Sequence, residues 1–127
     1  LQAALAQAIG EGWSFPKENR DVLQHNREII VGALEDVQGL QIHVPQAGYF
    51  LLADFAQLTD KDATTVNDVL TRKVGVTGIP ATALCREGSE TAKRFRSFIR
   101  FSFCKSTEEV EDAAQRIRNN LDVFQSL

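Results

Sequence analysis

The stretch Ser97–Lys105, SFIRFSFCK, decides the fold class, because it predicts a strand with two different faces. Side chains alternate along a strand, so Ile99, Phe101 and Phe103 are expected to share one apolar face. The alternate residues Phe98, Arg100, Ser102 and Cys104 are expected on the opposite face. Arg100 is thus a permanent charge in the middle of a largely apolar strand, and that position needs an explanation.

Helical patterns surround this strand. Apolar residues spaced three and four apart predict helices over residues 1–9, 16–39, 62–75 and from Ser106 to about residue 124. Ser106 followed by Glu109 is typical of a capping box at the start of the last helix. The chain therefore has enough helix to cover a small sheet on one side.

Extended patterns predict the other strands. LQIHV, residues 40–44, and the run Tyr49–Ala53 are close enough in sequence to form a hairpin, with Gly48 near its turn. The run Tyr49–Ala53 is apolar on both faces, which predicts that it is covered on both sides. Residues 76–90 read as irregular with one short strand, and residues 91–96 as a basic connection. This order favours an α+β fold with three or four largely antiparallel strands and helices on one face.

Composition limits the possible functions. A chain of 127 residues with 43% hydrophobic and 24% charged residues fits a single folded domain. Its net charge of −3 disfavours a general nucleic-acid-binding protein. No apolar run is long enough to span a bilayer, and no secretory signal pattern opens the chain. The two cysteines, Cys85 and Cys104, lack a CxxC spacing and are interpreted as reduced thiols of a cytoplasmic protein.

Few motifs carry chemistry. His25 and His43 have no further metal ligands at the usual spacing, so a structural role is preferred for both, and no metal site is expected. No phosphate-binding glycine loop or Ser-His-Asp arrangement is present. The cations Lys93, Arg94 and Arg96 could contact phosphates, but a solvated loop is the preferred reading in an acidic chain.

Arg100 is the best candidate for a functional residue. Its position alone fits a surface arginine on the open face of a strand. It also fits a carboxylate-binding residue, because the planar guanidinium fork pairs with a carboxylate through two hydrogen bonds. A strand flanked by apolar side chains would aim that fork and limit its screening by water.

Three stretches in this order, PQAGYFLLADF, VLTRKVGVTGIPATAL and FIRFSFCKSTEEVEDAAQRI, resemble the C-terminal third of the class I/II aminotransferases. Among their subgroups the chain is most similar to the kynurenine/glutamine transaminase-like branch. The resemblance implies the small domain of an aspartate-aminotransferase-like (fold type I) enzyme that uses pyridoxal phosphate. Residues 1–39 would be a helical connection from a large domain, and residues 40–127 the small-domain sheet and helices.

The resemblance also implies roles for particular residues. Arg100 would bind the α-carboxylate of an amino acid or 2-oxo acid substrate, and Gly48 and Phe50 would lie near the pocket for the substrate's side chain. No catalytic or cofactor-binding residue is expected in this segment, since none of its lysines has a suitable context: Lys17, Lys61, Lys73, Lys93 and Lys105. The cofactor lysine would belong to the large domain. The segment alone would bind no pyridoxal phosphate and would be inactive.

Further expectations concern the parent protein. The small domain would move to close the site over bound substrate. The parent would be a homodimer, with no nucleic-acid or membrane partner. The chain starts at Leu1, without methionine and within an amphipathic pattern, which predicts a piece of a longer protein. The compartment predicted is the cytoplasm, with an organelle left open.

Two alternatives compete with the enzyme. The first is a stand-alone α+β module without catalysis, in which Arg100 binds another anion or a carboxylate of a partner protein. The second is an RNA-recognition sheet, which is disfavoured because Phe101 and Phe103 are expected on the core side and the net charge is negative.

Overall fold

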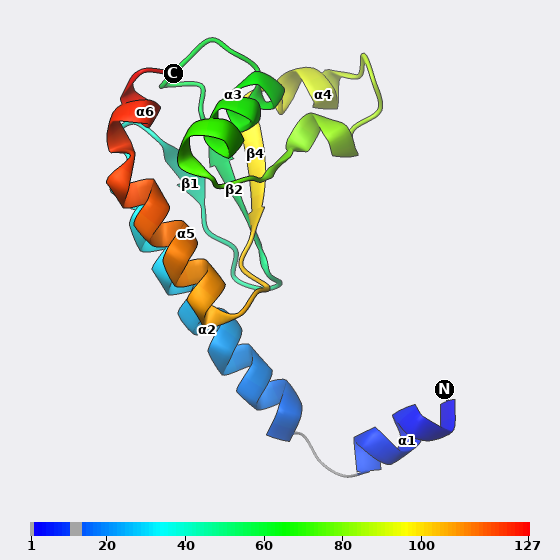
Figure 1. Ribbon diagram of the computed structural model, residues 1–127. Helices are drawn as coiled ribbons and strands as arrows, with labels where there is room; N and C mark the ends of the chain where they lie inside the picture. The colour runs from blue at the N-terminus through cyan, green and yellow to red at the C-terminus, as the bar shows by residue number, and fades with distance from the viewer. Residues whose placement is uncertain (1, 11–13) are drawn as a thin grey trace.

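The structure is a computed structural model that describes residues 2–10 and 14–127 (Figure 1). The predicted first helix included Leu1, and Gly12 was expected near its end; both residues lie outside the described residues. The elements follow in the order α1 (Gln2–Gly10), α2 (Ser14–Glu35), β1 (Gln41–His43), β2 (Phe50–Asp54), α3 (Ala63–Val69), the π-helix η1 (Leu70–Val74), β3 (Ile79–Pro80), the 3₁₀-helix η2 (Ala81–Leu84), α4 (Glu90–Arg94), β4 (Phe98–Ser102), α5 (Thr107–Asn119) and α6 (Leu121–Gln125).

The four strands form one antiparallel sheet in the order β1-β2-β4-β3. The predicted α+β class and the predicted hairpin of β1 and β2 are therefore confirmed. Gly48 lies in the turn with a φ of 79°, in the left-handed region that suits glycine. The strand that carries Arg100, β4, is central and pairs with β2 on one side and β3 on the other.

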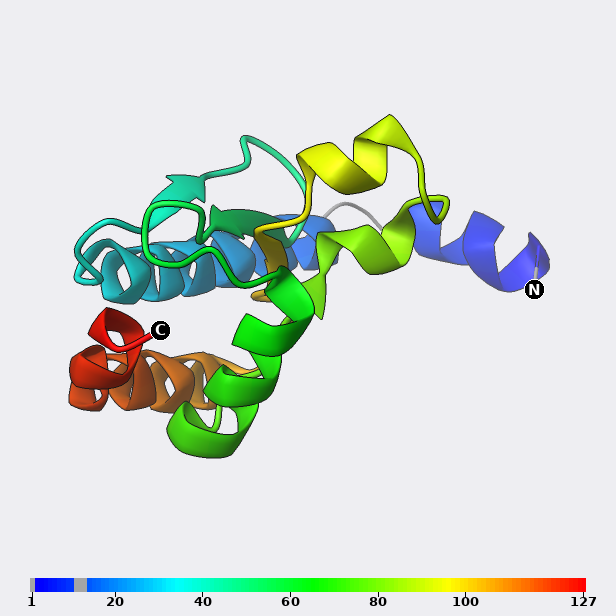
Figure 2. The same ribbon diagram turned by 90° about the horizontal axis from the view of Figure 1, so that it is seen from above.

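One face of the sheet forms the core. Ile99, Phe101 and Phe103 are buried, as the alternation predicts, and Leu51 of β2 is buried beside them. They pack with residues of α2, η1, α5 and α6 in a single hydrophobic cluster. In Figures 1 and 2, α2 and α5 run side by side along the sheet, and in this way the longest apolar helical stripes of the sequence are buried.

The opposite face of the sheet stays partly open, so within this chain β2 is not covered on both sides as expected. Leu51 and Ala53 are buried, but Phe50 on the other face is 37% exposed and Leu52 is half-buried. Among the described residues, nothing buries that face completely. The apolar pattern of β2 is therefore matched by cover on one side of the sheet only.

Three further details differ from the sequence prediction. Residues 91–94 of the predicted connection belong, with Glu90, to the helix α4, because the Ser89 side chain accepts a hydrogen bond from the backbone N–H of Ala92 and caps its start. The predicted last helix divides at Asn120, whose φ of −129° is not helical. The third helix ends in the π-helix η1, where Gly75 N–H donates to the Leu70 carbonyl oxygen at 2.9 Å.

In the described parts of the chain, no helix combines the length and the apolar character that crossing a membrane requires.

Candidate functional site

Arg100 lies in the middle of β4, on the face that the helices leave open. Its direct neighbours across the sheet are Leu52 of β2 and Ile79 of β3. Both are apolar, and neither can donate or accept a hydrogen bond through its side chain. The guanidinium therefore emerges between two aliphatic side chains.

Phe50 lies against the guanidinium of Arg100. The distance from Arg100 Cζ to the centre of the Phe50 ring is 4.0 Å, within the range of a cation–π contact. Phe50 pairs with Ser102 in the sheet, so it is a diagonal neighbour of Arg100 on the same face. Of the three predicted site residues, the structure thus brings Arg100 and Phe50 into direct contact.

The charge of Arg100 has no acidic partner among the described residues, where it forms neither an ion pair nor a hydrogen bond. Arg27 is the other half-buried cation, and it donates to the Pro45 carbonyl oxygen at 3.0 Å. Every other lysine and arginine of the chain is exposed. Arg100 therefore combines partial burial with a complete set of unused N–H donors, which suits a planar anion such as a carboxylate.

Gly78 lets β3 approach β4 at the position of Arg100. A Cβ atom at residue 78 would collide with Ile99 Cγ2 and lie 2.9 Å from the carbonyl oxygen of Arg100. Only glycine leaves room for this approach. The absence of a side chain at Gly78 therefore allows the close packing of this segment against the backbone of Arg100.

Asn67 of α3 holds the loop that contains Gly78. Its Oδ1 accepts a hydrogen bond from the Gly78 N–H at 2.8 Å, and its Nδ2 donates to Thr77 Oγ1 at 3.4 Å. The loop is thus anchored to a helix of the core side. Sequence reasoning missed both residues, although a glycine before the short strand at Ile79 is a signal for close backbone approach.

Asn26 fixes the other end of β4 to α2. It is completely buried, and its Nδ2 donates to the carbonyl oxygens of Phe103, at 3.2 Å, and Lys105, at 2.8 Å. Its Oδ1 accepts from Thr107 Oγ1 at 2.9 Å. Sequence reasoning missed this residue too. The available signal was a polar side chain interrupting the apolar stripe of the long helix.

Gly48 lies apart from the Arg100–Phe50 contact. It lines a cleft of about 410 Å³ between the first half of α2 and the β1–β2 turn, together with Tyr49 and Arg27. Neither Arg100 nor Phe50 lines this cleft. A role for Gly48 near a substrate's side chain therefore stays a prediction.

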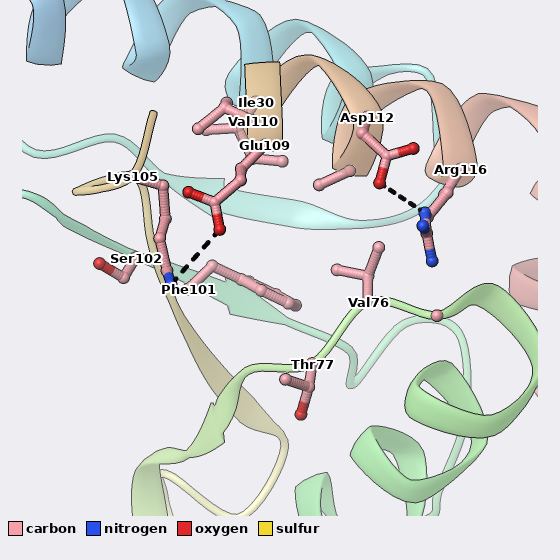
Figure 3. A pocket seen from close by; sticks show the side chains of 12 residues that line it. Ile30, Val76, Thr77, Phe101, Ser102, Lys105, Glu109, Val110, Asp112 and Arg116 are labelled. Carbon is pink, nitrogen blue, oxygen red and sulfur yellow. Dashed lines mark ion pairs between the residues drawn. The ribbon is translucent and has the colours of Figure 1, made fainter. Parts of the chain in front are cut away.

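A second cleft, of about 350 Å³, lies between α5 and the loop after η1 (Figure 3). Its two cations are already paired. Lys105 Nζ lies 3.7 Å from Glu109 Oε1, and Arg116 Nε lies 2.8 Å from Asp112 Oδ2. Phe101 points into this cleft from the core face of β4. The cleft is thus on the opposite side of the sheet from Arg100 and offers no unpaired cation for an anion.

Neither a group of metal ligands nor a shifted pKa indicates a second functional site among the described residues. His25 and His43 belong to no group of three possible metal ligands there. The ring of His43 instead lies beside that of Phe98, with 5.6 Å between the ring centres. The pKa of Asp62 is lowered mainly by the backbone hydrogen bond from Thr65, at a helix cap. That group is a cap at the start of α3, so its shift reflects the helix and marks no site.

The comparisons with known proteins agree with this fold. The family described as aminotransferase class I and II matches residues 1–117. Human kynurenine–oxoglutarate transaminase 3 is 34% identical over 141 residues, covering 92% of this chain and 28% of the human protein. This chain spans between 28% and 30% of the length of such curated relatives.

Solved structures match as well. The N-succinyldiaminopimelate aminotransferase of Mycobacterium tuberculosis has a TM-score of 0.78 and 29% identity, over 93% of this chain and 29% of that chain. The aspartate aminotransferase of Rhizobium meliloti, with a TM-score of 0.75 and 23% identity over 95% of this chain and 30% of its own, shows likeness of fold alone. The predicted aspartate-aminotransferase-like fold and the family resemblance are confirmed.

Proposed function

This chain belongs to the class I and II aminotransferases, and we propose that it is the small domain of an enzyme that moves an amino group between an amino acid and a 2-oxo acid. Arg100 binds the α-carboxylate of each substrate in turn. Its role is to bind and orient the substrate, which converts a chance encounter into a defined geometry. Arg100 is thus a binding residue in this proposal, and no residue of the segment is assigned a catalytic step.

The observation that carries this proposal is the unpaired, half-buried guanidinium of Arg100. Arg27, the other half-buried cation among the described residues, donates to a backbone carbonyl oxygen. Arg100 instead lies against a phenyl ring. A substrate carboxylate would supply two charge-assisted hydrogen bonds in an apolar setting, where such a pair is poorly screened.

Pyridoxal phosphate is the cofactor that the family implies, and the described residues of this segment do not fit it. The cofactor needs a buried lysine for its covalent link and groups that hold its phosphate. All five lysines of the segment are exposed. We therefore assign the cofactor to a large domain of the parent protein, and assign no step through it to this chain.

The same proposal covers the domain arrangement. No residue of α1 is buried, and the described side chains at the start of α2, residues 16–22, are exposed as well. This supports residues 1–39 as a connection to a large domain and residues 40–127 as the small domain that closes over substrate. A homodimeric parent in the cytoplasm completes the proposal, with the two free cysteines, Cys85 and Cys104, consistent with a reducing compartment.

The proposal is tested in the full-length protein that contains this sequence. Arg100→Gln should lower kcat/KM for amino acids by about 30- to 5,000-fold, the equivalent of roughly 2–5 kcal/mol for a lost charge pair, mainly through KM. Arg86→Gln is the matched control, because Arg86 is an exposed arginine without a described partner. The absorbance of bound cofactor should be unchanged in both variants. Unchanged kinetics in Arg100→Gln would remove Arg100 from the site.

A further inference from the structure

We propose that Phe50 is a positioning residue for Arg100: its ring orients the guanidinium for a carboxylate without neutralising its charge. This inference rests on the proposed function of Arg100 and concerns the same site. It assigns Phe50 a role other than the one expected from the sequence, which was to lie near the pocket for the substrate's side chain. The carboxylate is common to all substrates, so the contribution of Phe50 should not depend on the substrate's side chain.

The sheet register makes this contact a property of the fold. Leu52 of β2 is the direct partner of Arg100, and Phe50 is two residues further along the same strand and on the same face. Diagonal neighbours in an antiparallel pair are within reach of long and aromatic side chains. The Cζ-to-ring distance of 4.0 Å is well inside the limit of about 6 Å for a cation–π contact.

A ring is a suitable partner for a cation that must bind an anion. An acidic residue at the same place would compete with the substrate's carboxylate for the N–H donors of Arg100. A phenyl ring accepts the cation through its face and takes no conventional hydrogen bond from the guanidinium. The donors in the guanidinium plane thus stay available while the side chain loses freedom before substrate arrives.

Phe50 has a second ring contact besides that with Arg100. Its backbone belongs to β2, and its ring lies 4.6 Å from the Tyr49 ring, measured between the ring centres. Arg100 is supported in turn through Gly78 and the paired β3 strand. Both members of the contact are therefore mounted on strands, which are more rigid than loops as a support for a binding group.

The test is a double-mutant cycle in the full-length protein, with Phe50→Leu, Arg100→Gln and the double variant. Phe50→Leu should lower kcat/KM by about 3- to 30-fold, the range expected for a cation–π contact. Phe50→Tyr, which keeps the ring, should restore it. In the Arg100→Gln background Phe50→Leu should have no further effect, because the cation is absent.

Two further readouts separate positioning from other roles. The loss in Phe50→Leu should be the same factor for alanine as for phenylalanine as amino donor. The Kd for 3-phenylpropanoate, a carboxylate that cannot react, should rise by a similar factor in calorimetry. Cofactor absorbance and the thermal transition report folding, and Phe50→Met provides the ringless comparison if Phe50→Leu does not fold.

The contradicting outcomes are distinct. Losses that multiply independently in the double variant, or a loss confined to phenylalanine, would overturn the positioning role and leave Arg100 as the carboxylate-binding residue. An Arg100→Gln variant with unchanged kcat/KM would instead contradict the proposed function itself.

Discussion

Arg100 Cζ lies 4.0 Å from the centre of the Phe50 ring, on the face of the sheet that the helices leave open. The two residues that pair directly with Arg100 in the sheet, Leu52 and Ile79, are apolar. Arg100 thus lies between apolar partners that would strengthen an ion pair, and none of the described acidic residues pairs with it. A ligand with a carboxylate is the simplest partner that satisfies this arrangement.

Asn26 should be essential for the stability of the domain. Its completely buried side chain forms three hydrogen bonds, two to carbonyl oxygens just after β4 and one with Thr107 at the start of α5. Asn26→Ala removes the side-chain amide and leaves the partners unsatisfied, so the free energy of unfolding should fall by about 2–4 kcal/mol. Urea unfolding measures this. The exposed helix position Asn19→Ala is the control, with an expected change within about 0.5 kcal/mol. Equal effects of the two substitutions would contradict the role of Asn26.

Gly78 should be intolerant of alanine. The added Cβ would press on Ile99 Cγ2 and on the carbonyl oxygen of Arg100, so β3 and β4 must separate. Such overpacking costs typically 1–3 kcal/mol, and it should also weaken carboxylate binding. Gly32→Ala is the contrasting control, because its Cβ would meet only Arg118 Nη2 at 3.5 Å within a helix. That substitution should stabilise the protein slightly. Thermal unfolding that ranks the two variants in the opposite order would refute this.

The cap of α3 should make stability depend on pH. The Thr65 backbone N–H donates to Asp62 Oδ1 at 2.8 Å, and this hydrogen bond lowers the pKa of Asp62 below its ordinary value of 3.8. The carboxylate therefore stabilises the folded state above about pH 4, and this contribution is lost as the pH falls through the folded-state pKa. Asp62→Ala should lower the free energy of unfolding by about 1 kcal/mol at pH 7.

The difference between wild type and Asp62→Ala should shrink at pH 3, as measured by urea unfolding at both pH values. Asp62→Asn keeps an accepting oxygen that does not titrate, so its effect should be small and the same at both pH values. A difference for Asp62→Ala that stays constant from pH 7 to pH 3 would argue against the cap.

The 127-residue chain on its own should bind a hydrophobic dye or self-associate. Phe50 and Ile79 are 37% and 42% exposed on the open face, and Leu5 and Ile9 of α1 are exposed as well. Exposed apolar groups close together are typical of surfaces that another protein part covers. Dye fluorescence should fall in a Phe50→Ser/Ile79→Ser variant. A monomer that binds no dye would favour the stand-alone module over a domain of a larger enzyme.

Much of this arrangement could be predicted from the sequence, because it follows from local periodicity. Alternation alone assigned Ile99 to the core and Arg100 to the other face, and the Ser106–Glu109 capping box marked the start of the last helix; the structure confirms both. The predicted hairpin of β1 and β2 also follows from local signals. These features depend on neighbours a few residues apart.

The rest could not be predicted from local patterns, because it depends on pairing across the sheet. The Arg100–Phe50 contact requires the register of β2 against β4, and the tight fit at Gly78 requires the position of β3. Residues 91–96 were predicted as a connection, since the five-residue helix α4 has too few turns to show an apolar stripe. The second face of β2 is partly open within this chain, because apolar residues on both faces do not say which part of a protein covers them.

The most direct test of the central claim removes the carboxylate from the substrate. In the full-length protein, kcat/KM is compared between the best amino acid substrate and the amine with the same side chain but no carboxylate, for wild type and for Arg100→Gln. If Arg100 binds the α-carboxylate, wild type should prefer the amino acid strongly, and that preference should fall by about two to three orders of magnitude in the variant. An equal preference in both proteins would show that the carboxylate is bound elsewhere, and would contradict the account.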